Sequence, residues 1–225
     1  KIEFAVQMSG TKCEESIRKC LKEIPADNIE IDLKKGRVVI ESTMPWSEIQ
    51  EKIESSGRRA VLSGFGGQSA VAIVDKGNVD KTNVRGVVRF CATHVSENGA
   101  VVDGVVDGLE SNTEYNLNVH ECGDLSRGCS SVGEPINTQK IQTDENGRSV
   151  FRFVNSDLAV WNIIGRAVVV ADTNEADRLA CGIIARSAGI FENYKKICAC
   201  DGVTIWDERD RPVAGGDRRN NNSNL

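Results

Sequence analysis

Two cysteines near the end of the sequence are the residues best suited to chemistry. Cys198 and Cys200 are separated by a single alanine, and thiolates are soft ligands that favour Cu(I). Two thiolates on a pliable segment can approach one small ion from opposite sides, whereas on a rigid strand they would point to opposite faces. The motif therefore predicts a Cu(I) site on a loop. By itself it also fits an incidental pair of thiols or a redox dithiol.

The other cysteines and the overall charge set the broad class of protein. The chain has 225 residues, eight cysteines, two histidines and a net charge of -5. Eight cysteines in so long a chain, with an ordinary core, favour a cytoplasmic protein with separate thiol functions over a secreted disulfide framework. The acidic balance argues against a nucleic-acid partner. We expect no membrane span, since no apolar run approaches about 20 residues. We also expect no signal peptide, since the sequence does not open with a basic stretch followed by an apolar one.

The first region of the chain is predicted to be an α+β domain. Alternating apolar residues predict four strands, at residues 1–7, 29–33, 38–40 and 59–62. Helical spacing predicts two helices, one over residues 17–24 and one opening at residues 43–45 and ending at Gly57. The resulting βαββαβ order is the ferredoxin-like arrangement. We assign this domain to residues 1–66.

The second region, residues 67–190, is predicted to be all-β. Short β runs occupy residues 70–74, 86–92, 104–106, 116–121, 149–154 and 165–171. Turn dipeptides such as Asn146–Gly147 separate them and no convincing helix intervenes, which is typical of an antiparallel sandwich or barrel. After Gly189 the periodicity fades. Residues 191–225, which carry Cys198 and Cys200, are therefore predicted to be a flexible C-terminal segment.

The middle region resembles the Cu,Zn superoxide dismutase family. Four collinear segments carry the resemblance: VHECGD at 119–124, GC at 128–129, GRAVVV at 165–170 and RLACGII at 178–184. With EFAVQM at 3–8, CGIIARSAG at 181–189 and ICACDG at 197–202, nearly the whole chain is similar to the family of copper chaperones that serve this dismutase. The resemblance implies a Greek-key β-sandwich or barrel for residues 67–190.

The same comparison implies that the dismutase metal site is absent. Dismutases of this family hold copper with four histidines and zinc with three histidines and an aspartate. At the aligned positions, Asn118 and Ala171 replace copper ligands and His120 survives, while residues 130–145, where the zinc loop would lie, contain no histidine. Two histidines cannot build either cage, so we expect no enzyme activity and no zinc. His120 is then either a relic ligand or a residue that packs and hydrogen-bonds, and His94 is expected to be exposed beside a turn.

The resemblance also assigns roles to other cysteines. It implies an intrasubunit disulfide between Cys129 and Cys181, with two free, buried thiols as the alternative because cytosolic disulfides are uncommon. Cys91 and Cys122 lie within predicted β runs and are expected to pack as small apolar residues.

The first domain departs from the pattern of its kind. Metallochaperone domains of this type carry Met-x-Cys-x-x-Cys after the first strand, whereas residues 8–13 read MSGTKC, with Gly10 in place of the first cysteine. Cys20 cannot replace it, because seven helical residues separate it from Cys13 by about 10 Å, and it lies on the apolar stripe of the helix. The domain is therefore predicted to be mainly structural or a docking module, with Cys13 and Met8 as a weaker Cu(I) site.

The resemblance implies a non-enzymatic copper metallochaperone. Such a protein would dock on apo Cu,Zn superoxide dismutase as a heterodimer, deliver Cu(I) from Cys198 and Cys200, and promote formation of the disulfide of its target. A scaffold acting only in thiol–disulfide exchange and a general copper buffer are the alternatives that the sequence leaves open.

The docking surface is expected to copy the self-complementary face of a symmetric dimer. The residues that align with that face are Gly123, Asp124, Gly182, Ile183 and Ile184. A homodimer of this chain is the other assembly that the face would permit.

Overall fold

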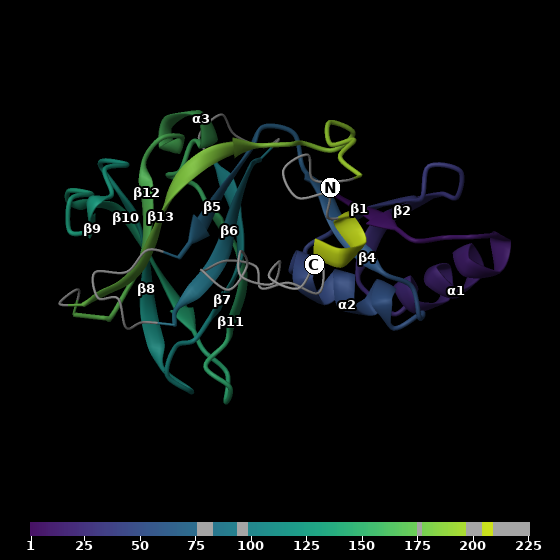
Figure 1. Ribbon diagram of the computed structural model, residues 1–225, viewed down its shortest axis with the longest axis horizontal. Helices are drawn as coiled ribbons and strands as arrows, with labels where there is room; N and C mark the ends of the chain where they lie inside the picture. Colours follow the sequence, from purple (N-terminus) through teal and green to yellow (C-terminus); the bar gives the residue numbers. More distant parts are fainter. Residues whose placement is uncertain (76–82, 94–98, 175–176, 197–203, 209–225) are drawn as a thin grey trace, which may run out of the picture. The chain divides into compact units, whose positions relative to one another are not determined.

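The computed structural model describes residues 1–75, 83–93, 99–174, 177–196 and 204–208 (Figure 1). Predictions about His94, Cys198 and Cys200 lie outside the described residues. The chain divides into two compact units. The first contains Lys1–Gly67 and the described part of Ala188–Arg211, and the second contains the described part of Gln68–Ser187.

The first unit has the predicted ferredoxin-like fold. Its elements are β1 (Ile2–Val6), α1 (Thr11–Leu21), β2 (Ala26–Asp32), β3 (Arg37–Ser42), α2 (Trp46–Glu54), β4 (Ala60–Phe65) and, from the end of the chain, α4 (Ile205–Glu208). The strands form an antiparallel sheet in the order β2-β3-β1-β4. Alternation on β1 buries Ile2, Phe4 and Val6, and the spacing of i, i+4 and i+8 on α1 buries Cys13, Ile17 and Leu21.

The second unit is an eight-stranded barrel that is nearly closed, which confirms the predicted all-β class. Its elements are β5 (Ser69–Val74), β6 (Arg85–Ala92), β7 (Ala100–Asp107), β8 (Glu114–His120), β9 (Ser126–Cys129), β10 (Pro135–Gln142), β11 (Ser149–Asn155), α3 (Val160–Ile163), β12 (Ala167–Ala171) and β13 (Arg178–Ser187). The sheet order is β10-β8-β12-β13-β5-β6-β7-β11. Asn155 Nδ2 donates to Asn137 Oδ1 at 2.9 Å between the two end strands.

Two hydrophobic clusters lie in the described part of the second unit. The larger fills the barrel and includes Val88, Phe90, Leu117, Val170 and Ile184. The smaller contains Cys129, Val132, Ala167, Val169, Ala171 and Cys181. Because Val169 and Val170 alternate on β12, one points to each cluster, and both faces of this strand are buried.

Three details differ from the sequence-based expectations for the second unit. Strand β10 occupies half of residues 130–145, where the resemblance placed a loop, and α3 adds one helical turn. Cys122 is exposed and follows β8 instead of packing within a strand, because β8 ends at His120. Cys91 on β6 is buried as expected.

Candidate functional site

The positions that resemble dismutase copper ligands come together on one face of β8 and β12. Alternation places Asn116, Asn118 and His120 on the same side of β8, and β12 pairs with β8 so that Ala171 lies opposite Asn116. Asn118, His120 and Ala171 are all buried. This face therefore gathers one imidazole with amide and methyl groups. Over the residues that the structure describes, no group of three or more His, Cys, Asp or Glu side chains could hold a metal ion.

His120 is fully buried and hydrogen-bonded. Its Nδ1 donates to the carbonyl oxygen of Gly133 at 2.9 Å, since a carbonyl oxygen can only accept. The guanidinium of Arg178 donates to the same carbonyl at 3.2 Å and to the carbonyl of Cys129 at 2.9 Å. The imidazole thus helps to hold the loop between β9 and β10 against the barrel. Arg178 begins the RLACGII segment, but no local sequence pattern around it indicates this role.

A disulfide joins Cys129, at the end of β9, to Cys181 on β13. Their Cα atoms lie 5.7 Å apart, and both residues are fully buried in the smaller hydrophobic cluster. The bond and the two Arg178 hydrogen bonds therefore fasten the same loop to the barrel.

The glycines of the expected docking face lie against neighbouring backbone. A Cβ atom on Gly123 would lie 2.0 Å from the carbonyl oxygen of Gly165, and one on Gly182 would lie 1.8 Å from that of Ile73. Only glycine fits such approaches without a backbone shift. Asp124 is exposed, and the pKa of its carboxyl is held below the ordinary value because the backbone N–H and hydroxyl of Ser126 hydrogen-bond to it.

Within this expected face, the side chains of Ile183 and Ile184 point to opposite sides of β13. Ile184 is fully buried in the barrel core, whereas the preceding Ile183 is 44% exposed, because alternate residues of a strand point to opposite sides. The structure adds Ile73 on β5, which is 47% exposed. Since Ile184 pairs with Ala72 in the antiparallel ladder, Ile183 and Ile73 are cross-strand neighbours on the outer surface. Ile73 stands in an apolar run whose outward positions sequence analysis did not separate.

In the first unit, Cys13 lies in the first turn of α1 and is only 3% exposed. Its Sγ lies 3.4 Å from the hydroxyl of Ser9. Hydrogen bonds from the side chain and backbone of Ser9, with smaller contributions from Gly10 and the charge of Arg58, outweigh the effect of burial and lower the pKa of Cys13 to about 7. A large thiolate fraction near neutral pH makes Cys13 a competent soft ligand.

Among the described residues, position 10 supplies no second thiol to Cys13, because it is a glycine. Gly10 has extended backbone with φ 177°, and a Cβ atom there would meet no other atom within 4 Å. Met8 is half-buried, as is Cys20 farther along α1, which the sequence had assigned to the core.

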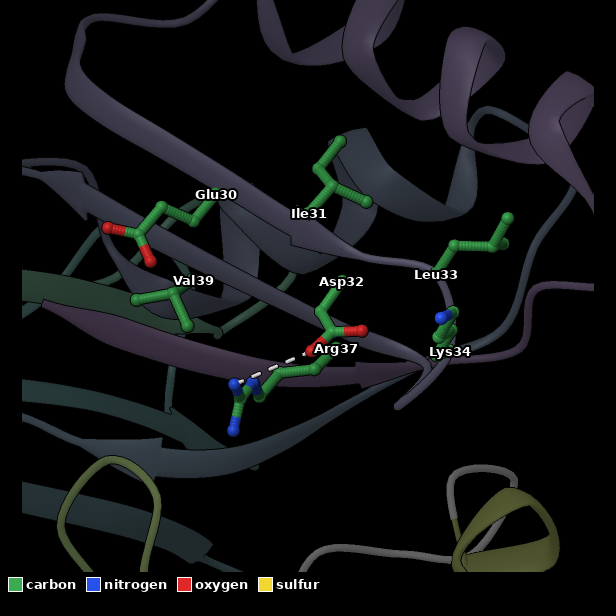
Figure 2. A pocket seen from close by; sticks show the side chains of 7 residues that line it. All are labelled: Glu30, Ile31, Asp32, Leu33, Lys34, Arg37 and Val39. Atoms are coloured by element: carbon green, nitrogen blue, oxygen red, sulfur yellow. Dashed lines mark ion pairs between the residues drawn. The ribbon is translucent and has the colours of Figure 1, made fainter.

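A cavity of about 500 Å³ lies at the β2–β3 hairpin of the first unit (Figure 2). Its lining combines the carboxylates of Glu30 and Asp32 with the cations of Lys34 and Arg37 and with aliphatic side chains, and Arg37 lies 3.8 Å from Asp32. The lining contains no thiol or imidazole, so it offers no soft ligand to Cu(I).

None of the described helices is long and apolar enough to span a bilayer.

Comparison with known proteins gives one consistent match. The family model for the heavy-metal-associated domain matches residues 3–59. The "Copper chaperone for superoxide dismutase" of Mus musculus is 37% identical and that of Homo sapiens 36% identical, each over 97% of this chain and 92% of its own length. The "Superoxide dismutase 1 copper chaperone" of Saccharomyces cerevisiae is 33% identical over 94% of both chains.

Proposed function

The chain belongs to the family of copper chaperones for superoxide dismutase, and from this premise we propose that it delivers copper to a Cu,Zn superoxide dismutase and is not itself an enzyme. The observation that supports a carrier most directly is the face shared by β8 and β12. On this face of the dismutase-like barrel, His120 shares its side of the sheet with Asn118 and Ala171, and its imidazole helps to hold a loop. Redox cycling of copper needs a fixed cage of several nitrogen ligands, which this face does not supply.

Cu(I) is the cargo, and Cys198 with Cys200 is the pair that carries it. Two thiolates can pass the ion to a target by stepwise ligand exchange, so that it is never released into solution. Cys13 supplies one thiolate with a lowered pKa, and Gly10 stands where a second cysteine would be expected, which favours a weaker site in the first domain. Zinc is not part of this proposal, because the barrel face offers it one imidazole.

Docking occurs on the outer surface around Ile73 and Ile183, beside Gly123, Asp124 and Gly182. Two exposed isoleucines on neighbouring strands make an apolar patch that a partner would remove from water. A chain with a dismutase-like barrel can present the same face that a dismutase presents to its own second copy, and this gives a heterodimer.

The carrier also promotes disulfide formation in its target. After Cu(I) has left, an external two-electron acceptor such as dioxygen must first oxidise the pair, and the resulting Cys198–Cys200 disulfide then accepts two electrons from a target dithiol. The target becomes a disulfide and the carrier pair becomes two thiols. A chain that performed only this exchange would be a scaffold without copper, which is the second candidate function.

Reconstitution of a dismutase tests the proposal. Cu(I)-loaded protein is mixed with apo Cu,Zn superoxide dismutase under a Cu(I) chelator, and recovered dismutase activity is measured. We expect activation by the wild type, near-complete loss in the Cys198→Ser/Cys200→Ser variant, and a much smaller loss in Cys13→Ser. Cys91→Ser, which alters a buried thiol of β6, is the matched control.

Four results would contradict parts of the proposal. Loss of activation in Cys13→Ser with full activity in the double variant would route copper through the first domain. If the wild type fails to bind Cu(I) but still oxidises the target dithiol, the second candidate function, a scaffold for thiol–disulfide exchange, would be correct. Stoichiometric zinc in the barrel, or dismutase activity of the isolated chain, would contradict the assignment as a carrier.

A further inference from the structure

The residues on either side of the proposed copper-transfer cysteines belong to the first unit. We call residues 188–196 the upstream flank and residues 204–207 the downstream flank. Both flanks lie in the unit formed by Lys1–Gly67 and Ala188–Arg211, and the sequence places Cys198 and Cys200 between them. Figure 1 shows α4, which begins in the downstream flank, beside β4.

The upstream flank is held by a buried carboxylate. Glu3 on β1 is only 5% exposed, and its Oε2 accepts a hydrogen bond from the backbone N–H of Phe191. A buried carboxylate is costly without hydrogen-bond donors, so this contact ties the flank to the sheet. The N–H of Ile190 also donates to the carbonyl of Gly66 at 2.9 Å. Two successive residues of the flank thus make backbone contacts with the first unit.

The side chain and backbone of Phe191 point to the same conclusion. Its ring lies 4.4 Å from the guanidinium carbon of Arg37, a cation–π arrangement. Its φ is +65°, a region that a phenylalanine adopts only where its surroundings hold it there. Gly64 on β4 also contributes to this contact, because it has no side chain and the backbone of Gly189 and Ile190 can therefore pack closely against it.

The downstream flank has its own contacts with the first unit. Arg59 donates from Nη1 to the carbonyl oxygen of Trp206 at 3.1 Å, and Ile205 is buried. Thr204 and Asp207 close the turn through two hydrogen bonds of 2.6 and 3.2 Å. The two flanks also meet, since the N–H of Ile205 donates to the carbonyl of Lys196 at 3.0 Å.

We infer that the first unit is a mount for the copper-transfer segment: Glu3, Arg37, Gly64 and Arg59 are positioning residues that fix both flanks. The inference rests on the proposed function and deepens it. It gives the first unit a role that needs no second thiol at Gly10. Because both ends of the segment that carries the cysteine pair are held on one domain, less conformational entropy remains to be lost when that segment engages a target.

Substitution of Gly64 displaces the upstream flank selectively. A Cβ atom at Gly64 would lie 2.5 Å from the oxygen of Gly189 and 2.8 Å from the Cα of Ile190, so Gly64→Ala must push the flank away. Gly67→Ala is the matched control, since a Cβ atom there meets nothing within 4 Å. Arg37→Gln, which removes the stacking on Phe191, is a second variant for the case in which Gly64→Ala does not fold. Lys35→Gln in the same hairpin is its control, because the side chain of Lys35 is exposed and makes an ion pair of 3.9 Å with Asp32.

Hydrogen exchange and trypsin cleavage directly measure how strongly the upstream flank is protected. In Gly64→Ala we expect the amides of Ile190 and Phe191 to exchange, and the bonds after Lys195 and Lys196 to be cut, at least about tenfold faster than in the wild type. Arg37→Gln should give a smaller increase, and both controls should match the wild type. At equal Cu(I) loading, Gly64→Ala should activate apo-dismutase several-fold more slowly while binding the same amount of Cu(I).

Two outcomes would contradict the positioning role of the first unit while leaving the proposed function in place. In one, the flank of folded Gly64→Ala and Arg37→Gln stays as protected as in the wild type. In the other, the flank is loosened and activation remains complete. A wild-type chain that activates no dismutase would instead remove the proposed function, and with it the purpose assigned to the flanks.

Discussion

Ile183 and Ile184 follow one another on β13, yet the first is 44% exposed and the second is fully buried in the barrel core. The same substitution at the two positions should therefore act through different properties. At Ile183 it changes a surface available to a partner. At Ile184 it changes the free energy of unfolding.

Ile183→Glu should abolish co-elution with apo-dismutase and leave the melting temperature almost unchanged. A carboxylate placed in an apolar contact must lose its hydration when the partner docks. Size-exclusion chromatography of the mixture measures the loss. Ile136→Glu is the matched control, because Ile136 is a similarly exposed isoleucine on β10. Equal co-elution of both variants would move the docking surface away from β13.

Ile184→Glu should destabilise the second unit by more than about 3 kcal/mol, because it buries an unpaired carboxylate. Urea unfolding followed by circular dichroism measures this change. A stable Ile184→Glu variant that still fails to bind the dismutase would return Ile184 to the docking face and contradict its place in the core.

Cys181→Ser should lower the free energy of unfolding by up to about 4 kcal/mol, the value expected for a disulfide that spans 52 residues. Cys91→Ser is the comparison, since Cys91 is a buried thiol outside any disulfide, and it should lose only about 1 kcal/mol. Chemical unfolding of both variants under oxidising conditions measures the difference. Equal losses would mean that the Cys129–Cys181 bond contributes little.

Ionisation of Cys13 should make the stability of the first domain depend on pH. With its pKa lowered from 9.0 to about 7, the folded chain favours the thiolate. Its contribution to stability is complete above the unfolded pKa and is lost as the pH falls through about 7. Thiolate absorbance near 240 nm, taken as the difference between wild type and Cys13→Ser, should therefore have its midpoint near pH 7. Ser9→Ala should move the midpoint upward, because the main hydrogen bond to the sulfur is lost; an unchanged midpoint would assign the shift to another group.

Much of the fold could be predicted from local patterns. Alternation in residues 1–7 and helical spacing in residues 17–24 correctly predicted elements of the ferredoxin-like unit, because each of these elements has one buried face. Strand β10 was missed since its apolar residues fall out of phase: Ile136 is exposed and Ile141 is buried. At a sheet end, only one side of such a strand contributes to the core signal.

The candidate site was less predictable, because its geometry depends on contacts distant in sequence. Alignment to a family placed Ile183 and Ile184 together on one face, and only the register with β5 separates them. The contact between Glu3 and Phe191 joins residues 188 positions apart. No local periodicity in residues 188–196 indicates that this flank lies on the first unit.

Gly10→Cys should convert the first domain into a copper site of its own. Gly10 has extended backbone that any residue can adopt, and its missing side chain faces open space, so the variant should fold with wild-type stability. The new thiol would lie three residues before Cys13, whose pKa is already lowered to about 7, and two thiolates bind Cu(I) far more tightly than one. The change is best made in the Cys198→Ser/Cys200→Ser background, where competition with a Cu(I) chelator should show about one ion regained per chain. Gly10→Ser in the same background is the matched control and should regain none. Equal Cu(I) binding by the cysteine and serine variants would show that the turn before α1 cannot bring a residue at position 10 to Cys13, and that this domain lacks more than one ligand for copper.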